Sequence, residues 1–113
     1  MSKRNTITTA PLIEVEQVLK ILGANLRTSR LARNLSIEAA AAKIGVGYRA
    51  VAAAEAGKPT AAIGIYFSLL WAYDLLGPAH TLADPTLDLL VQRAAKTRVR
   101  AYPSKRGELD NDF

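Results

Sequence analysis

The sequence of 113 residues contains no cysteine and a single histidine. Disulfide bonds, thiolate-bound zinc and a cysteine nucleophile are therefore excluded, and nothing indicates an oxidising compartment. The carboxylates of Asp74, Asp84 and Asp88 have no supporting histidine for a metal site, since His80 falls in an expected loop. We therefore expect a cytoplasmic protein that uses neither a metal nor a cofactor.

Aromatic residues are also scarce, at 6% of the chain, whereas 20 residues are alanine and half of all residues are hydrophobic. Alanine favours helices and is depleted in strands, so this composition is typical of short, closely packed helices and not of a β-sandwich. The length is below the ~150 residues of a typical domain. We expect one all-α domain with a modest core.

No apolar run is long enough to cross a bilayer. The most apolar stretch, residues 61–76, has 16 residues and contains Asp74, whereas a span needs about 20 residues and disfavours a central carboxylate. The N-terminal residues are polar and carry Lys3 and Arg4, but the run from Ile7 to Ile13 that follows is too short and too polar for the apolar region of a signal peptide. The sequence thus predicts a buried helix at 61–76, no targeting segment and no membrane partner.

Positive charge is concentrated in the first half of the chain. Residues 1–58 carry nine lysines and arginines against four acidic residues, whereas residues 59–113 carry six of each. A basic half indicates a polyanionic partner, most commonly nucleic acid. The alternative, a basic surface that is merely well solvated, stays open at this point.

Apolar spacing and stop signals divide the chain into five helices between a flexible arm, residues 1–12, and a charged, partly disordered tail, residues 97–113. The first helix carries a stripe made of Val15, Val18, Leu19, Leu22 and Leu26. The expected helices are Ile13 to about Arg33, stopped by Asn34; Ile37–Ile44, with Ser36 as N-cap and Gly45 as C-cap; Tyr48–Ala56; a helix capped by Thr60 that runs to Leu76; and a helix from Asp84-Pro85 to about Lys96.

The second and third expected helices have the spacing of a helix-turn-helix. Two short helices that cross steeply need a small residue on the first, and Ala41 occupies that place. The turn needs a positive φ, which Gly45 supplies four residues later. The second helix needs an inward anchor, and Val51 follows Gly45 by six residues. The other inward positions are taken by Ala40, Ile44, Val46 and Ala54.

Residues 22–58 resemble the helix-turn-helix domain of the Cro/repressor (Xre) family. The matching residues are Leu22, Leu26, Arg27, Arg30, Leu35, Ser36, Ala41, Lys43, Ile44, Gly45, Val46, Val51, Glu55, Gly57 and Lys58. Further along, the chain is similar to antitoxins of the HipB type, which are encoded beside HipA-like kinase toxins. That similarity rests on Leu69-Leu70-Trp71-Ala72, Leu75-Leu76, Asp84-Pro85, Asp88 and Arg98-Val99-Arg100.

The resemblance implies a lambda-repressor-like domain over residues 13–96 whose third helix lies in the major groove of DNA. Its outward residues here are Tyr48, Arg49, Ala52 and Ala53. Arg49 can donate two hydrogen bonds to guanine, whereas Ala52 offers only a methyl group. Phosphate contacts are expected from Ser36, Lys43, Gly47 and Lys58. Relatives often carry glutamine where this chain has Ile37 and polar residues where it has Ala52 and Ala53, so phosphate contacts and DNA shape should contribute more than usual.

Small alanines at core positions 40 and 54 must be compensated by closer packing or by the fourth helix, through Ile63, Tyr66, Phe67 and Leu70. The aromatic residues of that helix are Tyr66, Phe67, Trp71 and Tyr73. They exceed what a small core can hide, so some are expected in a homodimer contact made by helices four and five; all of them being internal is the alternative. Dimerisation also follows from the small number of bases that one such domain touches.

The remaining charged residues leave several interpretations open. Glu55 is expected to pair with Arg27 or Arg30 and tie the third helix to the first. The basic segment 93–106 can add phosphate contacts, bind a HipA-like toxin or serve as a solubility tail. No catalytic constellation is present, so we do not expect an enzyme. The leading hypothesis is a homodimeric repressor of double-stranded DNA that acts as an autoregulating antitoxin; the alternative is a protein-interaction module of the same fold without specific DNA binding.

Overall fold

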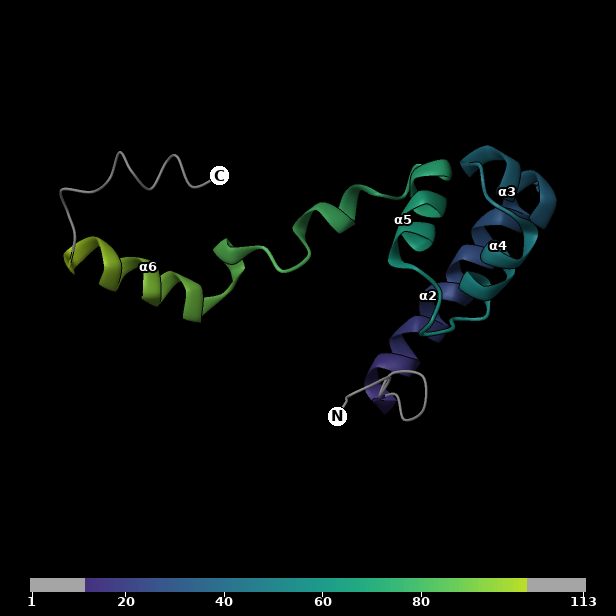
Figure 1. Cartoon of the computed structure of the whole chain (residues 1–113). Helices are drawn as coiled ribbons and strands as arrows, with labels where there is room; N and C mark the ends of the chain where they lie inside the picture. Colours follow the sequence, from purple (N-terminus) through teal and green to yellow (C-terminus); the bar gives the residue numbers. More distant parts are fainter. Residues whose placement is uncertain (1–11, 102–113) are drawn as a thin grey trace. The chain divides into compact units, whose positions relative to one another are not determined.

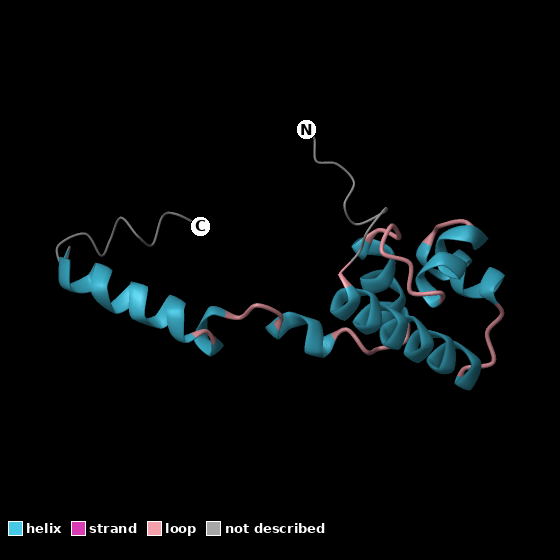
Figure 2. Cartoon of the chain, turned by 90° about the horizontal axis from the view of Figure 1, so that it is seen from below, coloured by secondary structure: helices cyan, strands magenta, loops and turns pink. Residues whose placement is uncertain are grey.

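The computed structural model describes residues 12–101, and all regular secondary structure in this range is helical (Figure 2). The elements are α2 (Ile13–Ala32), α3 (Ile37–Ile44), α4 (Tyr48–Glu55), α5 (Ile63–Ala72), the 3-10 helices η1 (Gly77–Thr81) and η2 (Pro85–Leu87), and α6 (Leu89–Ala101). The all-α prediction is confirmed for this range. The predicted arm, up to residue 11, and the tail from residue 102 lie outside it.

The chain divides into two compact units, with the boundary between Gly77 and Pro78. The first unit contains α2 to α5, which gather around one core (Figure 1). The second unit contains η2 and α6, which pack against each other. The sequence predicted one domain over residues 13–96. In the structure, the last helix of that predicted domain, α6, belongs to the second unit.

Local capping signals act as expected around α3. The Ser36 hydroxyl oxygen accepts a hydrogen bond from the Ala39 amide at 3.0 Å and caps the N-terminus. Gly45 ends the helix in the left-handed region with φ 73°, which glycine adopts without a steric penalty. Asn34, after α2, is likewise left-handed with φ 56°. These predictions are confirmed. They could be made from the sequence because each cap depends on only a few neighbouring residues.

The fourth predicted helix is shorter than expected at both ends. Residue Ala62, and not Thr60, is the N-cap of α5, since the Lys58 carbonyl accepts from the Ala61 amide and holds the preceding residues in a turn. At the other end Asp74 adopts φ 60°, and the Leu75 amide donates to the Leu70 carbonyl at 2.8 Å. This left-handed stop ends α5 before Leu75 and Leu76, although the apolar pattern continues through them.

The fifth predicted helix begins later and extends further than expected. Asp84 caps the 3-10 helix η2 by accepting from the Thr86 amide at 2.9 Å. Asp88 then accepts from the Leu90 amide at 2.9 Å and caps α6. The helix continues to Ala101, past the predicted limit at Lys96 and into the segment assigned to the tail.

The core of the first unit is small and rich in alanine. Its buried residues are Leu26, Ala40, Ala41, Val51, Ala54, Tyr66, Leu69 and Tyr73. The inward positions predicted for α3 and α4 are therefore confirmed, and Tyr66 with the half-buried Phe67 and Leu70 fills the space as expected. Ile63 does not, since it is 67% exposed. Along the predicted stripe of α2, Leu19, Leu22 and Leu26 pack in or against the core, whereas Val15 and Val18, nearer the start of the helix, are exposed among the described residues.

Two glycines bring α2 and the end of α4 into backbone contact. A methyl group on Gly23 would lie 2.6 Å from the carbonyl oxygens of Ala54 and Glu55. Gly57 has φ 70°, and a methyl group there would lie 2.6 Å from the Lys20 Cα. The small alanine core is thus matched by an unusually close approach of helices, the first of the two compensations expected from the sequence.

Two buried tyrosines differ in the state of their hydroxyl groups. The Tyr66 hydroxyl donates to the Lys58 carbonyl at 2.8 Å, whereas the Tyr73 hydroxyl has no hydrogen-bond partner among the described residues. Burial raises the pKa of both phenols. A buried hydroxyl without a partner loses its hydrogen bonds to water on folding and gains none in the protein. Tyr73→Phe should therefore leave the free energy of unfolding unchanged or raise it.

The matched variant Tyr66→Phe should lower the free energy of unfolding by about 1 kcal/mol, since it removes a buried hydrogen bond and leaves the carbonyl with one donor fewer. Urea denaturation of both variants measures the difference. A loss in Tyr73→Phe as large as that in Tyr66→Phe would contradict this assignment.

Candidate nucleic-acid interface

The arrangement of α3 and α4 is determined by three residues at the expected spacing. Ala41 is 3% exposed, and Val51, on α4, is fully buried. Between them, residues 45–47 connect the helices, with Gly45 left-handed and Gly47 extended at ψ 165° as the N-cap of α4. The Val46 amide donates to the Ala41 carbonyl at 3.0 Å and closes the turn. This geometry presents the N-terminus of α4 to solvent.

A buried ion pair holds α4 against α2. Arg30 Nε donates to Glu55 Oε2 at 2.6 Å and Arg30 Nη2 to Glu55 Oε1 at 3.0 Å, a two-bond arrangement. The third donor, Nη1, reaches the Leu35 carbonyl at 2.8 Å, just before α3. The pair with Glu55 raises the pKa of Arg30 against the opposing effect of burial. Of the two partners left open for Glu55, the structure selects Arg30, and Arg27 is exposed.

Tyr48 and Arg49 are the exposed residues at the start of α4. Tyr48 is 50% exposed and Arg49 is exposed, as predicted. Ala52 and Ala53, one turn later, are only half exposed. Since α4 has eight residues and is about 12 Å long, its first turn is the only part that offers long side chains to solvent. Any direct contact with bases would therefore depend on these two residues.

The residues predicted to contact phosphates are spread over the unit. Ser36 is exposed, but its hydroxyl oxygen is already engaged as the cap of α3. Gly47 is exposed at the N-terminus of α4. Lys58 is exposed just beyond the opposite end of α4. Lys43, also exposed, lines a shallow hollow of about 240 Å³ together with Trp71, Ala72 and Asp74, which come from α5 and the turn after it.

A contact that the sequence did not predict joins the ends of α2 and α5. Arg33 Nη2 donates to the Tyr73 carbonyl at 2.7 Å, and the guanidinium lies over the Tyr73 ring, 5.3 Å from its centre. The two residues are 40 positions apart, and the polar side chain of Arg33 carried no periodic signal. The contact with Tyr73 gives the Arg33 guanidinium a structural role, so we do not count it among the cations that could bind a polyanion.

Comparisons with protein-family models, with curated proteins and with solved structures found no match to this chain. Within residues 12–101 no group of histidine and acidic side chains is arranged to hold a metal ion. No helix in the same range has both the length and the apolar character needed to cross a membrane.

Proposed function

We propose that this chain binds double-stranded DNA through a helix-turn-helix formed by α3 and α4. The observation that carries the proposal is the pair Tyr48 and Arg49, exposed in the first turn of a helix that Val51 and Glu55 anchor from its other side. A helix whose N-terminal residues protrude fits the major groove and reaches base edges with those residues. The exposed Lys43 and Lys58 on the same unit supply attraction for the phosphates.

Direct reading of bases then depends on Arg49. Its guanidinium can donate two hydrogen bonds to the O6 and N7 of one guanine, a contact that discriminates by about 1–3 kcal/mol. Tyr48 offers a hydroxyl to a phosphate or a ring to a base. The half-exposed Ala52 and Ala53 add only methyl contacts. Binding should therefore depend strongly on phosphate contacts and on DNA shape.

The outer face of α5 supports a homodimer. Ile63, Phe67 and Trp71 follow one another at intervals of four residues and so share one side of the helix. Ile63 is 67% and Trp71 62% exposed, and Phe67 is half-buried. Of the four aromatic residues considered for this role, Tyr66 and Tyr73 are instead buried in the core. A two-fold contact through this face would bring two α4 helices into one dimer, as the recognition of two half-sites requires.

The proposal extends to repression and to an antitoxin role. A dimer that covers an operator overlapping its own promoter blocks transcription by steric exclusion. A HipA-like kinase toxin as the protein partner is supported by the resemblance to HipB-type antitoxins at Leu69-Leu70-Trp71-Ala72, Leu75-Leu76, Asp84-Pro85, Asp88 and Arg98-Val99-Arg100. Co-expression with a kinase-like gene from the same operon tests this: a stable complex on size-exclusion chromatography is expected, and a chain that elutes alone would reduce the proposal to a stand-alone regulator.

Electrophoretic mobility shifts with the DNA upstream of the gene, at 50 and 200 mM salt, test DNA binding. The affinity of the wild-type protein should fall by a factor of ten or more over this range, because phosphate contacts release counterions. Arg49→Ala should weaken binding to the upstream DNA about 5- to 150-fold, and its affinity for unrelated DNA should change much less.

The matched control is Lys43→Ala, which should weaken binding to both DNAs by a similar factor because a phosphate contact carries no base information. Circular dichroism checks that both variants fold, as expected for exposed positions. Weak binding that ignores sequence and is unchanged in Arg49→Ala would instead support the alternative, a protein-interaction module, which the alanine-rich α4 favours.

A further inference from the structure

The outward side of α4 consists of one long cationic side chain and two methyl groups. Val51 and Ala54 are fully buried and define the inward side of the helix. At about 100° per residue, Arg49 lies opposite the midpoint between these two residues. Ala52 and Ala53 follow one turn later, about 60° and 40° to either side of Arg49, and both are half exposed. The surface that α4 turns away from the core is therefore an arginine flanked by methyl groups.

The other polar side chains of α4 do not add a base contact beyond the first turn. Apart from Tyr48 and Arg49, the only polar residue of the helix is Glu55. Its carboxylate is bound by Arg30 and its side chain is only 6% exposed. The remaining positions are Val51 and alanines. After its first turn, the helix can therefore recognise a base only by apolar contact.

Thymine is the base that such a methyl surface recognises. In the major groove it presents a C5-methyl group, whereas guanine presents the O6 and N7 acceptors that an arginine binds with two hydrogen bonds. Residues three and four positions apart on a helix have Cβ atoms about 5–6 Å apart, and bases follow one another every 3.4 Å or so along each strand. Ala52 and Ala53 are thus placed to reach base pairs one or two steps away from the one that Arg49 contacts.

We propose that α4 reads guanine and thymine on neighbouring base pairs. Arg49 binds the guanine, and Ala52 and Ala53 cover the C5-methyl groups of thymines one or two base pairs away. This base preference rests on the proposed DNA binding and adds the sequence that the same site selects. It makes both alanines specificity-determining residues, although neither side chain can form a hydrogen bond. The contact is lost when the methyl group of either partner is removed.

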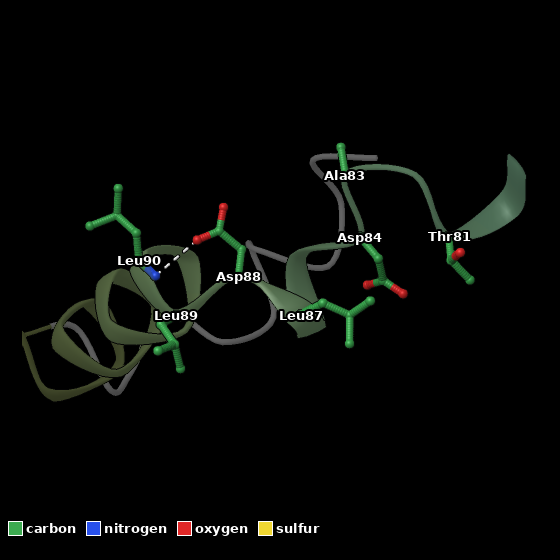
Figure 3. A pocket seen from close by; sticks show the side chains of 7 residues that line it. All are labelled: Thr81, Ala83, Asp84, Leu87, Asp88, Leu89 and Leu90. Carbon is green, nitrogen blue, oxygen red and sulfur yellow. Dashed lines mark hydrogen bonds between the residues drawn. The ribbon is translucent and has the colours of Figure 1, made fainter. Parts of the chain in front are cut away.

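The exposed hollow of the second unit has a chemistry that does not suit DNA. Figure 3 shows Leu87, Leu89 and Leu90 beside Asp84 and Asp88 around an open hollow of about 500 Å³. Carboxylates repel the phosphates that dominate the affinity of proteins for DNA. We therefore assign base recognition to α4 and not to this hollow, and Leu90→Ala should leave the base preference unchanged.

Modified nucleotides test the proposal with the full chain and the DNA upstream of the gene. One amplified product contains deoxyuridine in place of every thymidine and lacks the C5-methyl groups; another contains 7-deazaguanine and lacks N7. The wild-type protein should bind the uracil product about fourfold more weakly for each thymine covered, as expected for one buried methyl group. Since amplified DNA contains no 5-methylcytosine, the methyl groups involved belong to thymine. The 7-deazaguanine product should weaken binding by the wild type but not by Arg49→Ala.

Glycine variants separate the methyl contacts from any effect of uracil on DNA shape. Ala52→Gly and Ala53→Gly, made singly, should each reduce the ratio of affinities for thymine and uracil DNA. The matched control is Ala50→Gly, the same substitution in the same helix about 100° around from Arg49, and it should keep the wild-type ratio. Because the measurement is a ratio between two DNAs, a loss of helix stability common to the three variants does not affect it.

Each result decides the proposal. A preference for thymine DNA that both outward variants reduce and Ala50→Gly retains supports it. Sequence-specific binding with equal affinity for the two DNAs overturns the base preference and leaves the proposed function intact. A preference that persists unchanged in Ala52→Gly and Ala53→Gly also overturns it, because DNA shape then accounts for the effect. Binding that ignores sequence, measured by competition with unrelated DNA, overturns the base preference and the proposed function together.

Discussion

Replacing Glu55 by alanine should lower the free energy of unfolding by about 3–5 kcal/mol, because it leaves the guanidinium of Arg30 buried without its counterion. The side chains of Arg30 and Glu55 are only 7% and 6% exposed, so water cannot replace the lost carboxylate. A unit of this size has a total stability of roughly 3–10 kcal/mol. Urea denaturation followed by circular dichroism should show Glu55→Ala close to the threshold of folding at 25 °C.

The double variant Arg30→Met with Glu55→Leu is the control for this prediction. It removes both charges and keeps apolar volume, so it should recover a large part of the loss. If Glu55→Ala cost less than about 1 kcal/mol, the pair would behave as an exposed salt bridge and the assigned burial would be wrong. The double variant also separates stability from positioning: it should fold, yet bind the upstream DNA more weakly if the donor to the Leu35 carbonyl helps to orient α3.

Replacing Gly23 by alanine should also destabilise the first unit, by about 1–3 kcal/mol or more. The new methyl group would lie 2.6 Å from two carbonyl oxygens, and both belong to the backbone of α4, which cannot rotate aside as a side chain can. To relieve the clash, α2 and α4 must move apart, and this separates Arg30 from Glu55. Thermal and urea denaturation measure the loss.

Gly64→Ala provides the matched control within the same unit. No atom lies within 4 Å of the position that its methyl group would occupy, and Gly64 lies in α5. Alanine there should raise the free energy of unfolding by about 0.5–1 kcal/mol, because glycine loses more conformational entropy in a helix. If Gly23→Ala were as stable as Gly64→Ala, the close approach of α2 to α4 would not exist in solution.

The close packing of α2 against α4 affects both the stability of the first unit and the position of the proposed interface. Gly23 sets how close α2 and α4 approach, and the ion pair of Arg30 with Glu55 joins them at that distance. Val51 completes the attachment from the core. As a result, contacts made farther along α4 hold its N-terminal turn in place. The side chains of Tyr48 and Arg49 are not needed for this attachment.

The helix bounds show which local signals are reliable. Ser36, Asn34 and Gly45 act as predicted because capping depends on the residue itself and on backbone groups within a few positions. Thr60 failed as a cap because residues 58–61 are held in a turn through the Lys58 carbonyl, which also accepts from Tyr66 in the core. Tertiary contact overrode a preference worth only about 1 kcal/mol.

The site shows the same division between local pattern and packing. Spacing alone indicated Ala41, Val51, Tyr48 and Arg49, because helical periodicity assigns inward and outward positions. Arg33, with its contact to Tyr73, could not be found in this way, since the two residues are 40 positions apart and neither carries a periodic signal. The choice of Arg30 over Arg27 for Glu55 likewise required knowing how α2 is rotated against α4.

By itself, the amino-acid order determined the helical class, the approximate helices, the stop after α2, the two caps of α3, and the spacing that makes Tyr48 and Arg49 the candidate contacts. These features come from neighbours within a turn or two, where backbone geometry is the same in every protein. Only the tertiary structure decided how closely α2 approaches α4, which arginine pairs with Glu55, and that α6 belongs to a separate unit. Those outcomes depend on how side chains from distant parts of the sequence pack together. The periodicity of a helix does not say how far such side chains lie from one another in space.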